Sequence, residues 1–263
     1  MKPKAGRLLC TTIMALSACA TPQWGAPPSA PTFSRTTERP AQGTLMADYE
    51  RSIRSAAVRD PSFEVDLRTI SPKKLQVTVA TFTEWGTPAS PTQRLIWVSL
   101  PGQLRSLCHD KPDSVLALQE ALGLPPQPVP MNPQHRWQVI TFTVPRSALF
   151  RPCPGGTDIA APRCANTLAK EMTEPTERTD TLDAATTRFL LDQLWNSNRI
   201  GFSKPAGAPD WGYPFTGMGW AYNWDPTAAS PVGVSEFVVR DDTVISNPVA
   251  ATPSQFCNNG DDR

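Results

Sequence analysis

The stretch Leu75-Gln76-Val77-Thr78-Val79-Ala80-Thr81-Phe82-Thr83 decides the fold that we predict for this chain. Its residues Leu75, Val77 and Val79 alternate with polar residues, which is the period-two pattern of a strand that buries one face. The run continues as far as Trp85-Gly86. We therefore predict a half-buried β-strand over this stretch.

Two neighbouring segments extend this pattern on either side. Residues 63–67 alternate in the same way, and residues 95–100 form a continuous apolar run. Turn-forming residues separate the three segments, at Ser71-Pro72 and between Gly86 and Pro91. We predict that the three strands form an antiparallel meander.

The remaining elements complete the predicted fold. Apolar residues recur at spacings of three and four in residues 44–58, 113–122 and 179–198, which predicts helices there. Further strands are predicted over residues 137–144, 233–239 and 243–246. The chain also has 29 prolines, which favour loops and rigid turns. The fold class that follows is α+β, mainly antiparallel sheet with three to four packed helices, and rich in loops.

The N-terminal residues have the order of a cleaved secretory signal. Three basic residues, Lys2, Lys4 and Arg7, precede an apolar run over residues 8–18. This run is shorter than the roughly 20 residues that span a bilayer core. It ends in Leu16-Ser17-Ala18-Cys19, which resembles the bacterial lipobox. An ordinary signal peptide is the alternative.

The resemblance to bacterial lipoproteins implies that Cys19 receives a diacylglycerol and becomes an acylated N-terminus. Three parts then follow: a signal peptide over residues 1–18, the acylated cysteine with a Pro/Ser/Thr-rich tether over residues 19–43, and a single globular domain over residues 44–263. The first partner is the lipid bilayer, because each buried methylene of an acyl chain contributes about 0.8 kcal/mol. Similarity to enterobacterial lipoproteins implies the outer membrane of the cell envelope, since Ala20 rather than Asp follows the cysteine.

Charge and composition exclude two classes of function. The whole chain carries a formal charge of +1, and residues 1–18 take three positive and no negative charges with them, so the mature chain carries −2. The mature chain lacks the excess of basic residues that is typical of nucleic-acid-binding proteins. Because no Cys-x-x-Cys occurs and His109 and His135 are the only histidines, we predict no metal site and no cofactor.

Four cysteines remain for disulfides once the signal peptide and the acylated cysteine are set aside: Cys108, Cys153, Cys164 and Cys257. An even number of cysteines in an exported chain predicts two disulfides. Three pairings are possible. We favour Cys153–Cys164, which closes a small loop, together with Cys108–Cys257, which ties the C-terminal part to the body of the domain.

Residues 210–226 are rich in aromatic rings separated by glycines. Five rings are candidate binding residues: Trp211, Tyr213, Trp220, Tyr222 and Trp224. One interpretation is that they form a core that bridges loops against the sheet. The other is a recognition surface for a glycan, a peptide or another envelope protein, because exposed Trp and Tyr are typical binding anchors.

The same block resembles a group of exported bacterial proteins that have no assigned activity. The shared runs are Gly-Tyr-Pro-aromatic-Thr, Gly-aromatic-x-Tyr-x-Trp and Ser-Glu-Phe-Val, which stand here at residues 212–216, 219–224 and 235–238. Residues 149–153 belong to the same likeness, which covers about residues 94–257. It implies an exported protein and indicates no reaction.

Glu236 is the candidate catalytic acid. It lies in the apolar strand predicted after the aromatic block, with its side chain opposite Phe237. A carboxylate beside a ring-lined cleft could orient a sugar or act as a base. Arg94, at the start of another predicted strand, could face it, by analogy with glycosyl-transferring folds, and Asp225 is a further candidate. The alternative is an ordinary Arg–Glu pair or a solvated strand face.

The sequence thus predicts a lipid-anchored envelope protein that binds an envelope protein or a surface glycan without catalysis. The alternative is an envelope enzyme, a glycan hydrolase or transferase, that uses Glu236 with Arg94 or Asp225. Geometry separates the two. Convergence of Arg94, Tyr213, Trp220 and Glu236 in one pocket would favour the enzyme, and buried rings with Glu236 in open water would oppose it.

Overall fold

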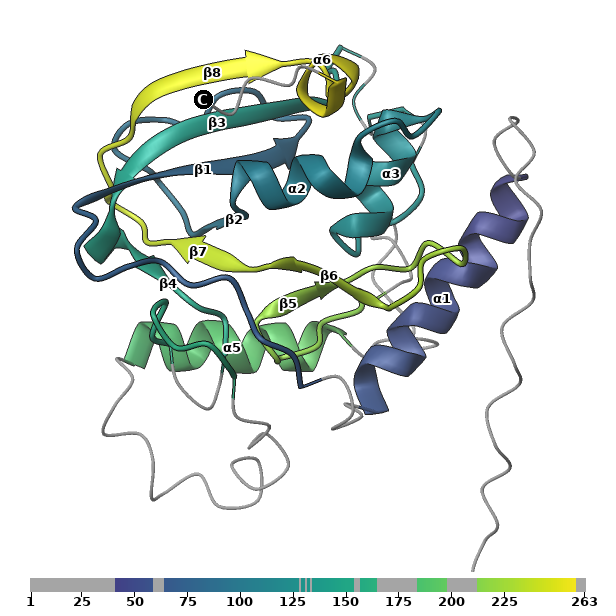
Figure 1. Cartoon of the computed structure of the whole chain (residues 1–263), viewed down its shortest axis with the longest axis horizontal. Helices are drawn as coiled ribbons and strands as arrows, with labels where there is room; N and C mark the ends of the chain where they lie inside the picture. The colour runs from purple at the N-terminus through teal and green to yellow at the C-terminus, as the bar shows by residue number, and fades with distance from the viewer. Residues whose placement is uncertain are drawn as a thin grey trace, which may run out of the picture. The chain divides into compact units, whose positions relative to one another are not determined.

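The computed structural model describes residues 41–58, 64–127, 129–130, 132, 134–153, 157–164, 184–197 and 212–258. Its helices are α1 (Gln42–Val58), α2 (Pro101–Cys108), α3 (Ser114–Ala121), α5 (Ala184–Ser197) and α6 (Pro253–Asn258), with a 3-10 turn η2 (Arg146–Ala148). Its strands are β1 (Gln76–Thr83), β2 (Ile96–Val98), β3 (Gln138–Pro145), β4 (Leu149–Phe150), β5 (Trp220–Tyr222), β6 (Val232–Ser235), β7 (Phe237–Val239) and β8 (Ser246–Ala251). The α+β class that we predict is confirmed (Figure 1).

The described strands form three antiparallel sheets. Their orders are β1-β3-β8, β2-β7-β4 and β5-β6. The longest ladder joins β1 to β3 over eight residues each, from Gln76 opposite Pro145 to Thr83 opposite Gln138. In this register Val77 and Val79 of β1 lie opposite Val144 and Phe142 of β3, so these apolar side chains share one face of the pair.

The β1-β3 pair buries residues on both of its faces. Val79 and Phe142 are opposite each other and belong to a core that includes Phe237 and Val239 of β7. On the other face, Ala80 and Phe82 belong to a second core with residues of α2, α3 and α6. The first sheet therefore lies between the second sheet and these helices.

The predicted meander is wrong in two respects. Residues 64–70 form no ladder; instead Leu67 N donates to Pro162 O at 2.7 Å, and Phe63 lies outside the described residues. In addition, β1 and β2 belong to different sheets, which touch through a single bridge between Ala80 and Ser99. Because β1 pairs with β3 rather than with its neighbour in sequence, local turn signals could not predict the pairing.

Two of the predicted helices, α1 and α3, form at the expected positions. In α1, Leu45, Tyr49 and Ile53 are buried on one face, as their spacing predicts. α3 begins at Asp113, whose Oδ1 accepts a hydrogen bond from Leu116 N at 2.9 Å. It is followed by Gly123 at φ +64°, a backbone conformation that favours glycine.

The helix α2 is not predicted from the sequence. It begins with Pro101 at a first-turn position, where the missing N–H of proline costs nothing. Leu104 and Cys108 on its inner face are fully buried. Their spacing of four was a signal of this helix.

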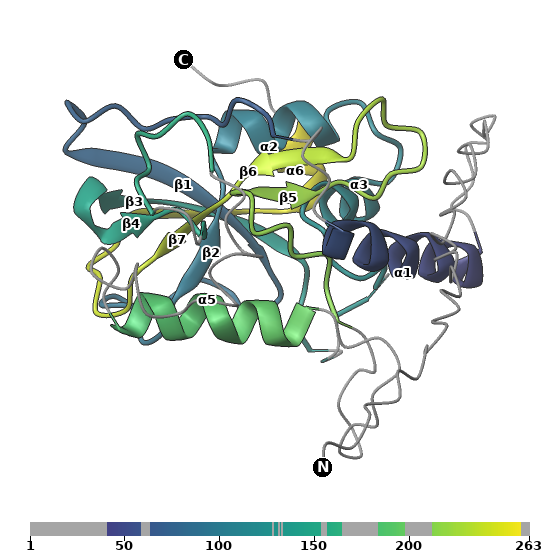
Figure 2. The same cartoon turned by 90° about the horizontal axis from the view of Figure 1, so that it is seen from below.

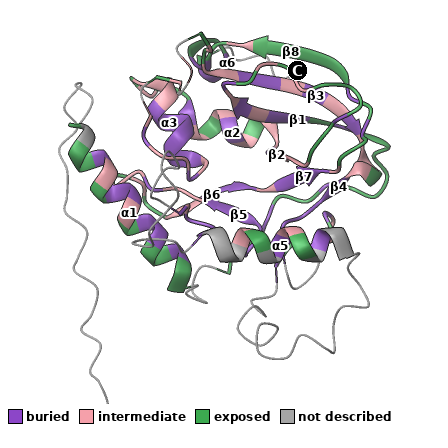
Figure 3. Ribbon diagram, turned by 180° about the vertical axis from the view of Figure 1, so that it is seen from behind, coloured by how far each residue is buried: buried purple, intermediate pink, exposed green. Residues whose placement is uncertain are grey.

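The third predicted helix is α5, which is described from Ala184, since residues 179–183 lie outside the described part. Its Phe189 contacts Trp97 of β2 and Phe150 of β4, at ring-centroid distances of 5.7 and 5.9 Å. α5 thus covers the second sheet, as Figures 1 and 2 show. In Figure 3 the strands β4 and β7 of this sheet are buried and β2 is partly buried, whereas β8 is largely exposed.

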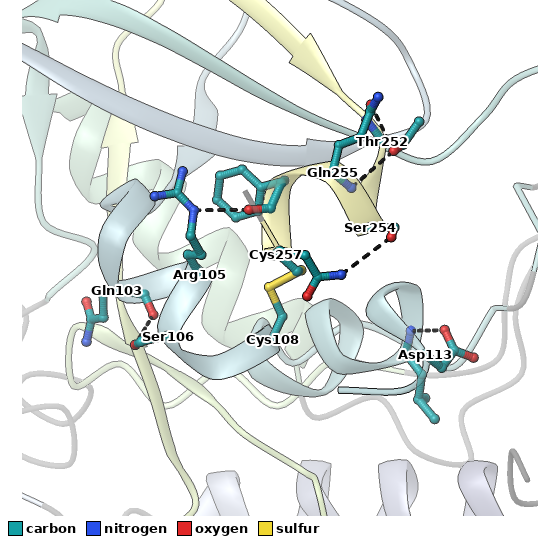
Figure 4. The surroundings of a disulfide bond; sticks show 12 residues. Gln103, Arg105, Ser106, Cys108, Asp113, Thr252, Ser254, Gln255 and Cys257 are labelled. Carbon is teal, nitrogen blue, oxygen red and sulfur yellow. Dashed lines mark hydrogen bonds between the residues drawn. A yellow bond between two sulfur atoms is a disulfide. The ribbon is translucent and has the colours of Figure 1, made fainter. Parts of the chain in front are cut away.

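Both predicted disulfides are confirmed. Cys108 at the end of α2 is bonded to Cys257 in α6, with Cα atoms 5.4 Å apart (Figure 4). Cys153 is bonded to Cys164, with Cα atoms 5.8 Å apart. Among the described helices, none is long and apolar enough to cross a bilayer.

Candidate functional site

Glu236 lies where one run of chain changes from one sheet to another. The preceding strand β6 pairs with β5, whereas the following strand β7 lies between β2 and β4. Between them, Glu236 N donates to Gly219 O at 2.9 Å. The single strand predicted over residues 233–239 is therefore wrong, because the backbone switches partners at this residue.

The register of β2 and β7 separates Arg94 from Glu236. Ile96 is opposite Val239, and Val98 is opposite Phe237. Continued along the pair, this register brings Glu236 toward Ser99 at one end and leaves Arg94 beyond the other. The facing Arg94–Glu236 pair is therefore wrong, because antiparallel strands place the start of one against the end of the other.

A cavity of about 280 Å³ lies where the two larger sheets touch, and Glu236 lines it. The backbone bridge between Ala80 and Ser99 forms one side. The lining residues come from β1, β2, the C-terminal end of α3, α5 and the segment before β5: Ala80, Thr81, Phe82, Trp97, Val98, Ser99, Leu122, Gly123, Leu124, Gln193, Tyr213, Pro214, Phe215 and Glu236. We call this hollow the Glu236 pocket. Its size approaches that of sites for small molecules, which occupy roughly 300–1,000 Å³.

The carboxyl group of Glu236 is held in its neutral form near neutral pH. Burial raises its pKa to about 8, and the positive charge of Arg151 opposes this only in part. Its Oε2 atom is buried and has no hydrogen-bond partner among the described residues. Buried polar atoms in native proteins nearly always have a hydrogen-bond partner, so this atom indicates that a further group binds here.

Arg151 is the charged residue that acts on Glu236, and it is held by backbone carbonyls. It is completely buried, and its Nη2 donates to Arg68 O at 2.8 Å. Its guanidinium carbon lies 4.8 Å from the centre of the Phe237 ring. Burial lowers the pKa of Arg151 to about 10, so it remains charged at neutral pH. Because no ion pair joins Arg151 to Glu236, the carboxyl keeps its proton.

Tyr213 and Gln193 lie on the wall of the same pocket. Tyr213 Oη donates to the side-chain oxygen of Gln193 and lies 3.2 Å from the Gln193 carbonyl oxygen. Burial raises the pKa of Tyr213 above its usual value, and the negative charge that Glu236 carries once it is ionised at high pH raises it further. The hydroxyl therefore keeps its proton, and the pocket contains two neutral groups that each carry an acidic hydrogen.

The aromatic rings of residues 210–226 are divided between the buried core and the Glu236 pocket. Trp220 and Trp224 are only 2% and 4% exposed, and Trp224 Nε1 donates to Leu124 O at 2.9 Å. These two rings, predicted as candidate binding residues, are buried parts of the core. Tyr222 is half-buried and packs against two apolar clusters, one that contains Trp220 and one that contains Trp224. Trp211 lies outside the described residues. Tyr213 is the predicted ring that lines the Glu236 pocket.

Asp225, the other candidate acid, has a structural role. It accepts a hydrogen bond from Lys111 Nζ at 2.8 Å, and Thr227 donates to it as well. Although burial raises its pKa, the bonds from Lys111 and Thr227 outweigh burial and lower it. Asp225 does not line the Glu236 pocket, so its pairing with Glu236 is wrong.

Several pocket residues were not anticipated from the sequence. Trp97, Ser99 and Gln193 come from a strand, a strand end and a helix that are distant from residues 210–226 in the chain. The apolar run at residues 95–100 was a signal that this segment is buried. The face that Trp97 presents depends on the pairing of β2 with β7, which the sequence does not specify.

A groove of about 830 Å³ adjoins the Glu236 pocket. Thr81, Phe82, Trp97 and Leu124 line both hollows and form their shared wall. Arg94 lines this groove, as does Glu84. The structure thus brings Tyr213 and Glu236 into one pocket, leaves Arg94 in the adjoining groove and places Trp220 in the core.

No protein-family model, curated protein or solved structure matches this chain. Among the described residues, no group of three or more His, Cys, Asp and Glu side chains is placed to hold a metal ion. Cys19, the signal peptide and all but the last residues of the predicted tether also lie outside the described part, which begins at residue 41. α1 begins at Gln42, within the last residues of the predicted tether.

Proposed function

We propose that this chain is a lipid-anchored protein of the bacterial envelope that binds a small neutral molecule in the Glu236 pocket. The observation that carries the proposal is the unpartnered Oε2 of Glu236 in a cavity of about 280 Å³. A neutral carboxyl can donate one hydrogen bond and accept another, and a dry site strengthens both. The ligand therefore has an acceptor such as a carbonyl or hydroxyl oxygen.

The walls of the pocket favour a ring-shaped ligand. Trp97 and Phe215 are in contact, with ring centroids 6.1 Å apart, and Phe215 lies 6.4 Å from Tyr213. Aromatic walls with a few polar groups are typical of small-molecule sites. A neutral sugar ring that carries an acetamido group meets both demands, since it has apolar faces, hydroxyl groups and a carbonyl. A surface glycan is also one of the partners that the sequence leaves open, beside another envelope protein.

Binding of N-acetylglucosamine to the oxidised domain tests this proposal. The wild-type affinity should fall about tenfold per pH unit above pH 8, because the ionised carboxyl has lost the proton that it donates. The affinity of Glu236→Gln should be independent of pH, since an amide both donates and accepts. Glu236→Ala should bind at least tenfold more weakly. An unchanged affinity in Glu236→Ala would remove the pocket from the proposal.

A second candidate is an enzyme that acts on glycans, with Glu236 as the general acid. The pKa of about 8 favours it, because proton transfer is most effective when the pKa is near the operating pH. Most glycosidases also need a second carboxylate, and Glu236 is the one carboxylate among the described lining residues of this pocket. Release of reducing ends by the wild type and not by Glu236→Gln, with binding retained, would establish the enzyme.

The anchor and the location rest on Leu16-Ser17-Ala18-Cys19, and we propose outer-membrane attachment through an acylated Cys19. Two disulfides in the folded domain support an oxidising compartment. Growth with labelled palmitate should label the wild type and leave Cys19→Ala unlabelled. Equal labelling of both proteins would contradict the anchor and leave the pocket proposal standing.

A further inference from the structure

The groove beside the Glu236 pocket carries aromatic rings at its surface and on its walls. Trp85 is 59% exposed, and its ring lies edge-on to His135 at 5.3 Å between centroids. Trp137 stacks on Phe82 at 4.8 Å, with 19° between the ring planes. Both tryptophans line the groove together with Trp97. Large flat rings are frequent anchors of binding sites.

Two polar atoms on the lining residues of this groove have no partner among the described residues. Glu84 is 5% exposed, and its Oε2 atom is buried without a hydrogen bond. The Nε1 atom of Trp137 is buried and unpartnered in the same way. The first is an acceptor and the second a donor. A ligand that fills the groove therefore has to offer both a donor and an acceptor.

We propose that this groove extends the Glu236 pocket and binds a neutral oligosaccharide. A sugar hydroxyl donates and accepts, so it can satisfy Glu84 and Trp137 alike, and sugar rings have apolar faces that stack on indoles. An extended proline-rich peptide, which also docks in aromatic grooves, has carbonyl acceptors but few N–H donors, and it would leave Glu84 unpartnered.

The charges of the groove favour a neutral chain. Among its described lining residues, Glu84 is the one acid and Arg94 the one base. One negative and one positive charge balance each other, so the groove has no electrostatic preference for a charged polymer. Phe82 and Trp97 line both hollows, so the groove and the pocket adjoin each other. This inference rests on the proposed function, because it places one sugar ring of the oligosaccharide in the Glu236 pocket and the following sugar rings along the groove.

Linear oligomers of N-acetylglucosamine, compared with the monomer by calorimetry, test the inference. The wild-type affinity should rise at least tenfold from the monomer to the longer oligomers. Trp85→Ala should bind the oligomers about tenfold more weakly than the wild type does, and it should bind the monomer as tightly as the wild type. Glu84→Gln should weaken oligomer binding in the same selective way. Because Trp85 is mostly exposed, its variant should fold normally, which far-ultraviolet circular dichroism checks.

A matched control uses another exposed apolar side chain away from both hollows. Val249 is 60% exposed on β8 and lines neither the pocket nor the groove. Val249→Ala should bind all oligomers like the wild type.

The outcomes separate the groove from the pocket. Binding of the monomer with no gain from length would overturn the groove and leave the proposed function standing. Binding of oligomers that depends on Trp85 but not on Glu236 would support the groove and overturn the pocket. Binding of polyproline, dependent on Trp85 and without any saccharide binding, would replace the oligosaccharide with a peptide and overturn this inference.

Discussion

Gly233 is a residue without room for a side chain. A Cβ atom at this position would lie 2.5 Å from the carbonyl oxygens of Ala121 and Ala221, both of which are backbone atoms. Neither oxygen can move without shifting α3 or β5. The absence of a side chain here therefore sets how closely β6 approaches both elements.

Gly233→Ala should lower the free energy of unfolding by at least about 2 kcal/mol, because overpacking against backbone strains both neighbours. Gly43→Ala is the matched control, since nothing lies within 4 Å of its added Cβ atom and its helical position favours alanine. Urea unfolding of the two variants measures the difference. Equal stabilities would contradict the close packing of β6.

Glu236 should give the stability of the domain a characteristic pH dependence. In the unfolded chain its carboxyl ionises near pH 4.5, but in the folded domain its pKa is about 8. Between these values the folded state holds a proton that the unfolded state has lost, so the free energy of unfolding falls as pH rises. The slope from this residue cannot exceed about 1.4 kcal/mol per pH unit.

Glu236→Gln should remove this contribution, since the amide cannot ionise. Its melting temperature, relative to the wild type, should therefore rise progressively from pH 5 to pH 8. Glu50→Gln is a suitable control, because that residue lies on the half-exposed side of α1 and lines neither hollow. A constant difference between Glu236→Gln and the wild type would mean that the carboxyl is already ionised in the folded domain.

At the scale of elements, the short helix α6 depends on its N-terminal cap. Thr252 and Gln255 cap each other: Gln255 N donates to Thr252 Oγ1 at 3.2 Å, and Thr252 N donates to Gln255 Oε1 at 3.0 Å (Figure 4). This is a capping box, which satisfies two N–H groups that a helix start leaves free. It holds the helix that carries Phe256 and Cys257 into the core.

Thr252→Ala should cost about 1 kcal/mol of stability, because it breaks one half of this cap. Thr252→Ser retains the hydroxyl and should cost only a few tenths. The midpoints of urea unfolding compare the two. An alanine variant as stable as the serine variant would show that the disulfide alone holds α6 in place.

Helices and strands with strong periodic patterns could be predicted from the sequence, but the strand that each strand pairs with could not. The alternation of β1 and the caps of α3 are local, so the sequence indicates them directly. The pairing of β1 with β3 joins segments about sixty residues apart, and hairpin signals favoured the wrong neighbour. The switch at Glu236 depends on Gly219, which lies in another loop. For the same reason Tyr213 and Glu236 could be anticipated in the site, whereas Trp97 and Gln193 could not.

At the scale of the whole molecule, two cross-links of very different span constrain the domain. Cys108–Cys257 joins positions 149 residues apart, and Cys153–Cys164 joins positions 11 apart. A longer loop removes more conformational freedom from the unfolded chain. The long cross-link also joins α2 to α6, two helices that cover the same face of the β1-β3 pair.

Replacing Cys108 and Cys257 together by alanine should therefore cost about 5 kcal/mol, and replacing Cys153 and Cys164 together about 3 kcal/mol. Urea unfolding of the two oxidised double variants gives both values. A larger loss from the short cross-link would mean that the loops around Arg151, rather than chain entropy, determine its effect.

For the exported chain that we propose, the span of the long cross-link also determines the order in which the bonds can form as the chain enters an oxidising compartment. Cys108 emerges first but cannot meet its partner until β3 to β8 have all followed. Cys153 and Cys164 emerge in the meantime, and each is a competing partner for the waiting thiol of Cys108. Because those two are only 11 positions apart, they can pair with each other as soon as both are exposed to oxidant. Early closure of the small loop would thus leave Cys257 as the one remaining match for Cys108 among the four, so the short bond protects the long one from scrambling.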